Sequence, residues 1–409
     1  MEHLNVYLHN ALIGKLTNNK GRLGFQYTPE YVSNPELGAL SYSIPVSPTP
    51  FDHDIAEPFF SNLLPDERIR KRIAVILRIS EENTFALLKE IGEDCAGAVS
   101  LYQPGNTPED ISSPIYRCLS EDEADRILSH LEQCPLNIGE KEFHISGAGA
   151  QDKLIASLEN GMIRLPLRGT PSTHIIKPGI KLITESVFNE YFCMRLALAC
   201  DLSAAKCNIL EVKGVPYYVT ERYDRIENDG IWTRLHQEDF CQLLGYDPKI
   251  KYESEGGPSL KQCFELLRDM ELPAADTLAF LKLVIFNFLI GNGDAHAKNF
   301  SVLYQHNQPC LAPAYDLMST TVYPDITPKL AMKIDREYEF SWISTNKFIR
   351  MGEKSGLSPK LIITEISKMK DKMNEVLKPL VSELSEEFPS DIYEEIQAGI
   401  CNRLAQLKT

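Results

Sequence analysis

Residues 290–303 read I-G-N-G-D-A-H-A-K-N-F-S-V-L, and the rest of the chain is interpreted outward from this stretch. An apolar run over residues 281–290 ends at Gly291 and predicts a buried helix. Polar residues follow, and residues 300–304 then predict a strand. A buried helix that ends in a polar loop and re-enters a sheet gives the loop a rigid frame, which suits a catalytic group.

Two polar residues of this loop, Asp294 and Asn299, are separated by four others. The catalytic loop of protein kinases has the same spacing: its aspartate accepts the hydroxyl proton and its asparagine holds magnesium. Asp316, in A-Y-D-L, follows a second β-type segment, where a kinase has its second metal ligand. Because D-x-x-x-x-N also arises by chance, the interpretation depends on what lies upstream.

Length and charge limit the possible classes of protein. The 409 residues are too many for one small core and predict two or three domains. The net charge of −15 argues against strong DNA binding over the whole surface, because phosphate binding needs clustered Lys and Arg. No signal peptide is evident and the longest apolar run, residues 278–290, is too short to span a bilayer. We therefore expect a cytoplasmic protein without a membrane partner, with its 10 cysteines reduced.

The first 103 residues predict a small α/β unit that carries no catalytic constellation. The expected elements are strands at residues 6–8, 12–16, 23–27 and 41–44, and helices from Pro65 and around residues 85–91. Residues 103–113, Q-P-G-N-T-P-E-D-I-S-S, are the best linker candidate. Ser120 then opens a helix as its N-cap, with Glu123 as the capping-box partner.

A run of small residues, S-G-A-G-A-Q-D-K at 146–153, leads into a predicted hairpin across Asn160-Gly161. Small residues let backbone amides approach a phosphate, as a nucleotide-covering loop requires, although a Gly-Ala run is more often an ordinary loop. A short strand then ends at Lys177, and a helix from Thr184 carries Glu190. A lysine on a strand followed by a glutamate on a helix is the ion pair that orients nucleotide phosphates in kinases.

The second half of the chain continues this kinase-like order. A hairpin around Lys213-Gly214 leads into residues 221–223, where a kinase has the hinge that meets adenine. From Gln237 onward the pattern is mostly helical, and residues 361–376 and 392–407 predict amphipathic helices.

Taken in order, these segments resemble the HipA family of bacterial serine/threonine kinases, the toxins of type II toxin–antitoxin systems. The motifs that carry the resemblance are S-G-A-G-A-Q-D-K, T-H-I-I-K, N-E-Y, E-R-Y-D-R, R-L-H-Q-E-D, K-Y-E-S-E-G-G-P, G-D-A-H-A-K-N-F-S and Y-D-L. The resemblance implies an α+β, atypical protein-kinase-like two-lobed fold. Its domains would be an N-terminal α/β subdomain (1–103), a linker (104–118), a mixed β N-lobe (119–225) and an all-α C-lobe (226–409) with the catalytic loop at 291–300.

The resemblance also implies a role for particular residues. Asp294 would be the catalytic base, and Asn299 and Asp316 would hold Mg²⁺. Lys177 would contact the ATP phosphates, with Glu190 as its ion-pair partner. The other residues expected to bind ATP are Ala148, Gly149, Ala150, Gln151, Asp152, Lys153, Glu221, Arg222, Tyr223, His296, Lys298 and Tyr315, together with Asn299 and Asp316.

The implied activity is ATP- and Mg²⁺-dependent phosphorylation of a protein, with an aminoacyl-tRNA synthetase as the substrate class and glutamyl-tRNA synthetase as the first candidate. A helix-turn-helix, HipB-like antitoxin would neutralise the toxin and supply contacts to operator DNA. Ser146 would be autophosphorylated and so switch the enzyme off, because the charge of a phosphoserine repels ATP. Two alternatives stay open: a catalytically silent ATP-binding co-repressor, and a small-molecule kinase.

Overall fold

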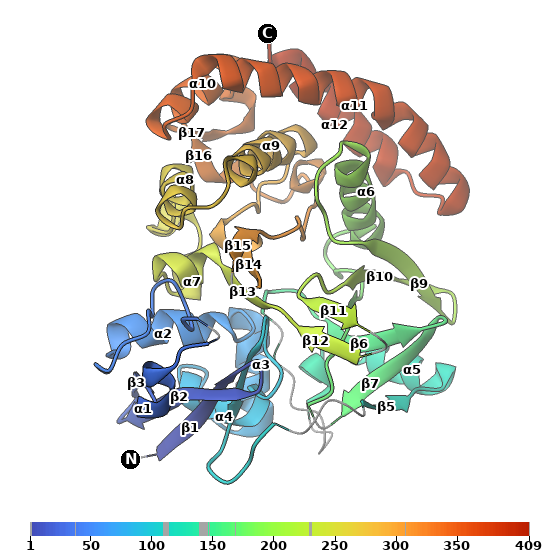
Figure 1. The fold of residues 1–409 in the computed structure, drawn as a ribbon. Coiled ribbons are helices and arrows are strands. Elements are labelled where there is room, and N and C mark those ends of the chain that lie inside the picture. The colour runs from blue at the N-terminus through green and yellow to red at the C-terminus, as the bar shows by residue number, and fades with distance from the viewer. Residues whose placement is uncertain are drawn as a thin grey trace. The chain divides into compact units, whose positions relative to one another are not determined.

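The computed structural model describes residues 2–36, 38–108, 114–138, 146, 148–167, 169–228, 231–306 and 308–408 (Figure 1). The chain forms two compact units. The first contains Met1–Pro178, Leu210–Lys249 and Val302–Pro309, and the second contains Gly179–Ile209, Ile250–Ser301 and Cys310–Thr409. These units divide the chain differently from the predicted domains, whose boundaries stay predictions. Among the described residues, no helix combines the length and apolarity needed to cross a membrane.

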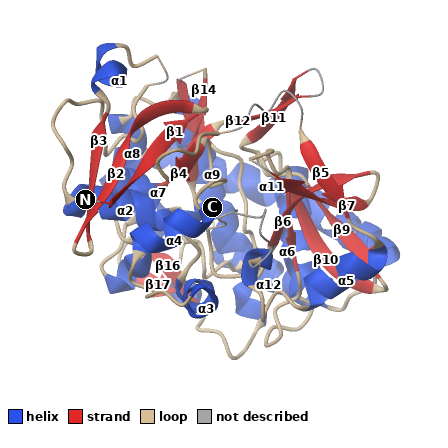
Figure 2. Cartoon of the chain, turned by 90° about the horizontal axis from the view of Figure 1, so that it is seen from below, coloured by secondary structure: helices blue, strands red, loops and turns tan. Residues whose placement is uncertain are grey.

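The first unit begins with a four-stranded sheet in the order β3-β2-β1-β4. Its strands are β1 (Glu2–Leu8), β2 (Ala11–Asn19), β3 (Arg22–Tyr27) and β4 (Val99–Tyr102). The helices that follow are α1 (Pro29–Ser33), α2 (His53–Asn62), α3 (Glu67–Leu77) and α4 (Thr84–Ile91). Helices α2 and α4 lie beside the sheet (Figures 1 and 2). Phe25, Phe59 and Phe60 are fully buried in the core that this sheet and these helices share.

The strand predicted at residues 41–44 is wrong. Ser41 and Ile44 close a tight turn through a single bridge, and the fourth strand of the sheet is β4, which pairs antiparallel with β1. The Tyr27 hydroxyl holds this segment, because it accepts the N–H of Leu40 and donates to the carbonyl of Ile44, both at 2.7 Å. The prolines that follow the turn cannot donate to a strand ladder, which explains why no strand continues.

A six-stranded sheet in the order β5-β7-β6-β8-β10-β9 follows. Its strands are β5 (Ile115–Cys118), β6 (Leu154–Glu159), β7 (Met162–Leu167), β8 (His174–Lys177), β9 (Cys207–Val212) and β10 (Val215–Glu221). The predicted β6–β7 hairpin is confirmed: Asn160 and Gly161 have φ of 49° and 78°, as a two-residue turn of this hand requires. Ile115–Cys118, at the end of the linker predicted at 104–118, forms strand β5 and pairs with β7.

The smaller elements of this unit complete its core. Helix α5 (Glu121–Ser129) has the predicted capping box of Ser120 and Glu123. The next elements are β11 (Arg225–Asn228), β12 (Ile231–Arg234), β13 (His236–Asp239), α7 (Phe240–Leu244), β14 (Ser301–Gln305) and β15 (Gln308–Leu311), the last of which continues into the part of the chain assigned to the second unit. Strands β13, β14 and β15 form a third sheet.

The second unit is mainly helical. Its helices are α6 (Ser186–Ala199), α8 (Leu260–Asp269), α9 (Ala274–Ile290), α10 (Thr345–Lys354), α11 (Pro359–Glu387) and α12 (Ile392–Gln406). The long helix α11 and its neighbour α12 pack against both α6 and α9 (Figure 1). Helix α9 is the central element, because its last eleven residues carry nine fully or nearly fully buried apolar side chains along with Asn287.

The prediction of an all-α C-lobe is wrong. Strands β16 (Lys329–Ile334) and β17 (Glu337–Glu339) form an antiparallel hairpin in the second unit. The large apolar side chains of Leu330, Met332 and Ile334 alternate along β16 with Lys329, Ala331 and Lys333 and are buried beside α8 and α9, and the small Ala331 is buried as well. Alternation with a period of two is the pattern of a half-buried strand, so the sequence did contain this element.

Candidate active site

The predicted catalytic loop begins where α9 ends. Gly291 adopts φ 76° at the C-cap, and a Cβ there would lie 2.1 Å from Thr321 Oγ1, so glycine is required for both backbone and space. The N–H groups of Thr320 and Thr321 both donate to the carbonyl of Gly291. Arg403 of α12 donates from Nε to the carbonyl of Leu289 at 2.8 Å, which places a cation at the helix C-terminus.

Asp294 is held by its backbone and by its side chain. Its N–H donates to Asn292 Oδ1 at 3.0 Å, and its carbonyl accepts from the N–H of His296 at 2.7 Å and from Asn299 Nδ2 at 2.9 Å. Its side chain is 53% exposed, and its Oδ1 accepts a hydrogen bond from the hydroxyl of Tyr252. A fixed backbone with an accessible carboxylate is the geometry that a general base needs.

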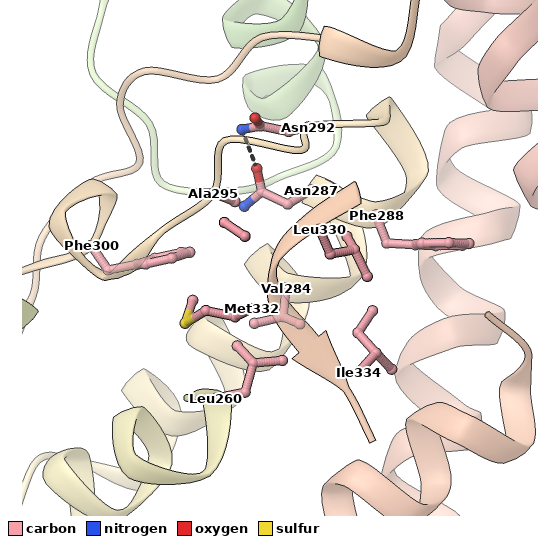
Figure 3. A pocket seen from close by; sticks show the side chains of 11 residues that line it. Leu260, Val284, Asn287, Phe288, Asn292, Ala295, Phe300, Leu330, Met332 and Ile334 are labelled. Carbon is pink, nitrogen blue, oxygen red and sulfur yellow. Dashed lines mark hydrogen bonds between the residues drawn. The ribbon is translucent and has the colours of Figure 1, made fainter. Parts of the chain in front are cut away.

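Beneath this loop lies a cavity of about 20 Å³, which is enough space for about one water molecule (Figure 3). Its walls are mostly apolar side chains of α8, α9 and β16. The exception is the pair of Asn287 and Asn292, whose side chains are hydrogen-bonded at 2.8 Å, as the dashed line in Figure 3 shows. This pair connects the last turn of α9 to the loop and orients the Asn292 oxygen that accepts the N–H of Asp294.

The residues predicted to hold Mg²⁺ have the right chemistry for it. The side-chain amide nitrogen of Asn299 donates to the Asp294 carbonyl. Its Oδ1 is therefore the side-chain atom that could bind a cation. Asp316 is exposed and has φ 55°. In the described part of the chain, no cluster of three or more His, Cys, Asp or Glu side chains could hold a metal. One amide and one carboxylate suit Mg²⁺, which usually keeps waters and takes its other ligands from substrate phosphates.

The remaining residues predicted to bind ATP in the second unit are close to Asn299 and Asp316 in sequence. His296 and Lys298 are buried, at 4% and 6% exposure. The hydroxyl of Tyr315 donates to the carbonyl of Lys298 at 2.8 Å and lies 2.7 Å from Ser301 Oγ. Tyr315, the neighbour of Asp316 in the chain, therefore fixes the start of β14. Direct contact of these residues with ATP stays a prediction.

In the first unit, residues 148–153 of the small-residue run form a loop. Gly149 has φ 100°, and a Cβ there would approach Lys153 Nζ to 2.8 Å. Lys153 donates to the carbonyl of Ala148, and the N–H of Asp66 donates to the carbonyl of Gly149 at 3.2 Å. Ala150 is exposed. Gln151 Nε2 donates to the carbonyl of Pro178 at 3.0 Å, and Asp152 pairs with Arg72.

Ser146 is buried in this loop, at 1% exposure. Its hydroxyl donates to the carbonyl of Leu63 at 2.6 Å, and its N–H donates to the carbonyl of Asp94 at 2.9 Å. Both partners belong to the N-terminal 103 residues, so the described position of Ser146 is built by that part of the chain.

Lys177 ends β8 and is 5% exposed, with Nζ 5.4 Å from the ring centre of Tyr218. Glu190, on α6, is 1% exposed. Because Lys177 belongs to the first unit and Glu190 to the second, their ion pair stays a prediction. Glu221, at the end of β10, is exposed and stands opposite His174 in the ladder.

Residues of the E-R-Y-D-R motif form a buried network of ion pairs and hydrogen bonds, which the sequence did not predict. Arg222 is 7% exposed, and its guanidinium bonds Asp224 and Ser172 Oγ at 2.8–3.0 Å. Asp94 accepts from Arg225 and Arg234 at 3.1 and 3.0 Å. The Arg222 side chain is thus used inside the protein, and its N–H donates to the carbonyl of Thr173 at 2.8 Å. The Tyr223 hydroxyl donates to Gln237, and direct contact of residues 221–223 with adenine stays a prediction.

This cluster is electrostatically self-consistent. Burial alone would raise the pKa of the Asp94 carboxyl, but the guanidiniums of Arg234, Arg225 and Arg222 hold it below its usual value. The pKa of Asp224 is also lowered against the effect of burial, chiefly by Arg222 and Arg225. Paired and fully hydrogen-bonded charges are the form in which ions are tolerated in a protein core.

Comparison with known proteins identifies the class. Residues 4–102 match the family model of the HipA N-terminal domain, and residues 145–378 match that of the HipA-like C-terminal domain. The chain belongs to the HipA family.

Particular relatives cover nearly the whole chain. The putative kinase Y4mE of Sinorhizobium fredii is 39% identical over 395 residues, which is 94% of this chain and 93% of that protein. The serine/threonine-protein kinase toxin HipA of Shewanella oneidensis is 29% identical over 398 residues, 92% of this chain and 89% of that protein. The solved complex of Shewanella oneidensis HipA, HipB and operator DNA contains a chain that matches with a TM-score of 0.84 and 26% identity, covering 98% and 96% of the two chains.

Proposed function

We propose that this protein is an ATP- and Mg²⁺-dependent serine/threonine protein kinase with an atypical two-lobed kinase fold, and that it acts as the toxin of a bacterial toxin–antitoxin module. The observation that carries the proposal is the loop after α9, where a half-exposed Asp294 carboxylate stands on a backbone fixed by Asn299 and Asn292. The Shewanella oneidensis relative is named as a serine/threonine kinase toxin, which supports the same conclusion.

In the proposed reaction, Asp294 accepts the proton of a substrate serine hydroxyl. As that O–H bond breaks, the oxygen bonds to the γ-phosphorus of ATP, the bond from phosphorus to the β,γ-bridging oxygen breaks, and ADP leaves. Asn299 Oδ1 and Asp316 would hold Mg²⁺, which neutralises phosphate charge when bound. Lys177, with Glu190 as its partner, and the loop from Ala148 to Lys153 would bind the phosphates, and residues 221–223 would meet adenine.

The proposed partners are argued from the net charge of this chain and from the complex in which a similar protein is found. A net charge of −15 makes this chain unsuited to bind DNA broadly, whereas the similar Shewanella oneidensis chain is found together with HipB and operator DNA. We therefore propose a HipB-like, helix-turn-helix antitoxin that carries the DNA contacts. An aminoacyl-tRNA synthetase, glutamyl-tRNA synthetase first, is the proposed substrate class by family resemblance alone.

We further propose that phosphorylation of Ser146 inactivates the enzyme. The Ser146 hydroxyl has a backbone carbonyl, that of Leu63, as its partner. A phosphoserine carries about −1.5 to −2 charges and only acceptor oxygens, so it would face an acceptor without a donor and would have to leave this position. Leaving would pull the loop of residues 148–153 away with it.

The test is intact-mass analysis and phosphosite mapping after incubation with Mg²⁺ and ATP. Wild type should gain phosphate on Ser146, and Asp294→Asn should lose about 10²- to 10⁴-fold in rate, the usual contribution of a general base. Asp325→Asn, an exposed aspartate in the same unit, is the matched control and should behave as wild type. ATP binding without phosphotransfer in wild type would instead support a silent binding module.

A further inference from the structure

The K-Y-E-S-E-G-G-P motif contains a tyrosine, Tyr252, that contacts the proposed base. The segment around it is rigid. The carbonyl of Tyr252 accepts from the N–H groups of Glu255 and Gly257 at 3.0 and 2.9 Å. Gly257 cannot be replaced without moving the backbone, because a Cβ there would lie 2.1 Å from the carbonyl oxygen of Ile250.

The same segment is fastened to β16. Glu253 accepts the backbone N–H of Lys333 at 2.6 Å and lies 3.7 Å from the Nζ of the same lysine. Since β16 belongs to the core of the second unit, Tyr252 stands on a frame built by residues outside the catalytic loop. This makes its contact with the loop a fixed one.

Tyr252 contacts only one of the two carboxylate oxygens of Asp294, namely Oδ1. Its hydroxyl donates to Asp294 Oδ1, and its ring meets His296 edge-on, with ring centres 5.1 Å apart and an interplanar angle of 85°. His296 Nε2 lies 3.8 Å from the same Oδ1. Both neighbours therefore approach Oδ1.

We propose that Tyr252 is a positioning residue that fixes the Asp294 carboxylate and leaves Oδ2 to receive the proton of the substrate hydroxyl. This inference rests on the proposed kinase function. The backbone of Asp294 is already fixed on both sides, so rotation of the side chain is the remaining freedom, and the Tyr252 hydroxyl removes it. A base held in one orientation meets the reacting hydroxyl more often in a productive geometry.

The kinetic test is Tyr252→Phe, which removes the hydroxyl and keeps the ring against His296. The expected result is a fall in kcat of about 10- to 100-fold, the usual weight of a hydrogen bond to a charged group, with KM for ATP unchanged. Tyr42→Phe, at an exposed tyrosine of the first unit, is the control and should keep the wild-type kcat. An unchanged kcat in Tyr252→Phe would overturn the proposal, and so would a faster one, because the hydroxyl would then obstruct the substrate.

A second measurement does not require activity. In protein labelled with ¹³C at tyrosine Cζ, the Tyr252 resonance is the one lost in Tyr252→Phe. It should shift in Asp294→Asn, because the acceptor has lost its charge. An unshifted resonance means that the hydrogen bond is absent in solution and overturns the proposal. If the Tyr252 resonance shifts in Asp294→Asn but the wild-type protein transfers no phosphate, the hydrogen bond is established and only the proposed function is refuted.

Discussion

Single residues carry the chemistry of the proposed site, and the sequence predicted some of them better than others. Asp294 and Asn299 could be found because they lie within one loop, where their spacing fixes their relation. The structure connects them directly, through Asn299 Nδ2 and the carbonyl of Asp294. Tyr252 could not be assigned a role, since it precedes Asp294 by 42 residues and the contact depends on how η3 (Glu253–Glu255) sits on β16.

Asp316 gives a prediction at this scale. Replacing Asp316 by Asn removes the charge, and Asn tolerates the observed φ of 55° better than most residues. The Mg²⁺ concentration for half-maximal phosphotransfer should rise about tenfold or more, because a carboxylate is a stronger ligand than an amide for this ion. A Mg²⁺ titration identical to that of wild type would rule out Asp316 as a ligand.

At the scale of elements, helices and hairpins with strong local patterns were predicted correctly. Helix α9, the capping box of α5 and the hairpin across Asn160 and Gly161 all follow from local rules. Two failures occurred where pairing is long-range: β4 joins β1 across some ninety residues of chain, and β5 joins β7 across about fifty. Two others were local, namely the strand expected at residues 41–44 and the missed β16–β17 hairpin. A short strand that pairs with a distant partner leaves little trace in its own sequence.

The end of α9 gives a prediction at the scale of elements. Arg403→Met keeps the bulk of the side chain but removes the donor to the Leu289 carbonyl and the contact with Thr321 Oγ1. Burial lowers the pKa of Arg403 to about 10, which leaves it charged at neutral pH. We expect a loss of about 2 kcal/mol in the free energy of unfolding, measured with urea, as for a charged hydrogen bond at a helix C-terminus. Arg336→Met, at an exposed position, is the control, and equal stability of both variants would contradict this role.

At the scale of the whole molecule, stability depends on buried ionisable groups that no local pattern reveals. Glu238 is 0% exposed, and its Oε1 accepts from the Tyr304 hydroxyl at 2.7 Å. Burial raises its pKa from 4.5 to about 7. His236 stacks on the same tyrosine, and burial lowers its pKa from 6.5 to about 4. The stabilising effect of neutral Glu238 is complete below pH 4.5 and lost as pH rises through 7, whereas that of neutral His236 is complete above pH 6.5 and lost as pH falls through 4.

These two dependences oppose each other between pH 4.5 and 6.5, so a variant is needed to separate them. Relative to wild type, Glu238→Gln should gain about 3 kcal/mol of stability as pH rises from 4.5 to 7.5, since each pKa unit is worth about 1.4 kcal/mol. Urea unfolding at several pH values measures this difference. Glu211→Gln, at an exposed position in the same unit, should show no such trend. A pH-independent difference for Glu238→Gln would mean that this carboxyl ionises normally.

The cluster of Asp94 with Arg222, Arg225 and Arg234 has a consequence for how such a chain can change over generations. Asp94 lies in the part of the sequence that matches one family model, and the three arginines lie in the part that matches the other. Loss of Asp94 by a single substitution would leave buried guanidiniums without one of their acidic partners, which should lower the free energy of unfolding by several kcal/mol. Lineages should therefore alter these positions together or keep them all, and grafting the first hundred residues from a distant homologue should succeed only when the donor brings its own matching acid.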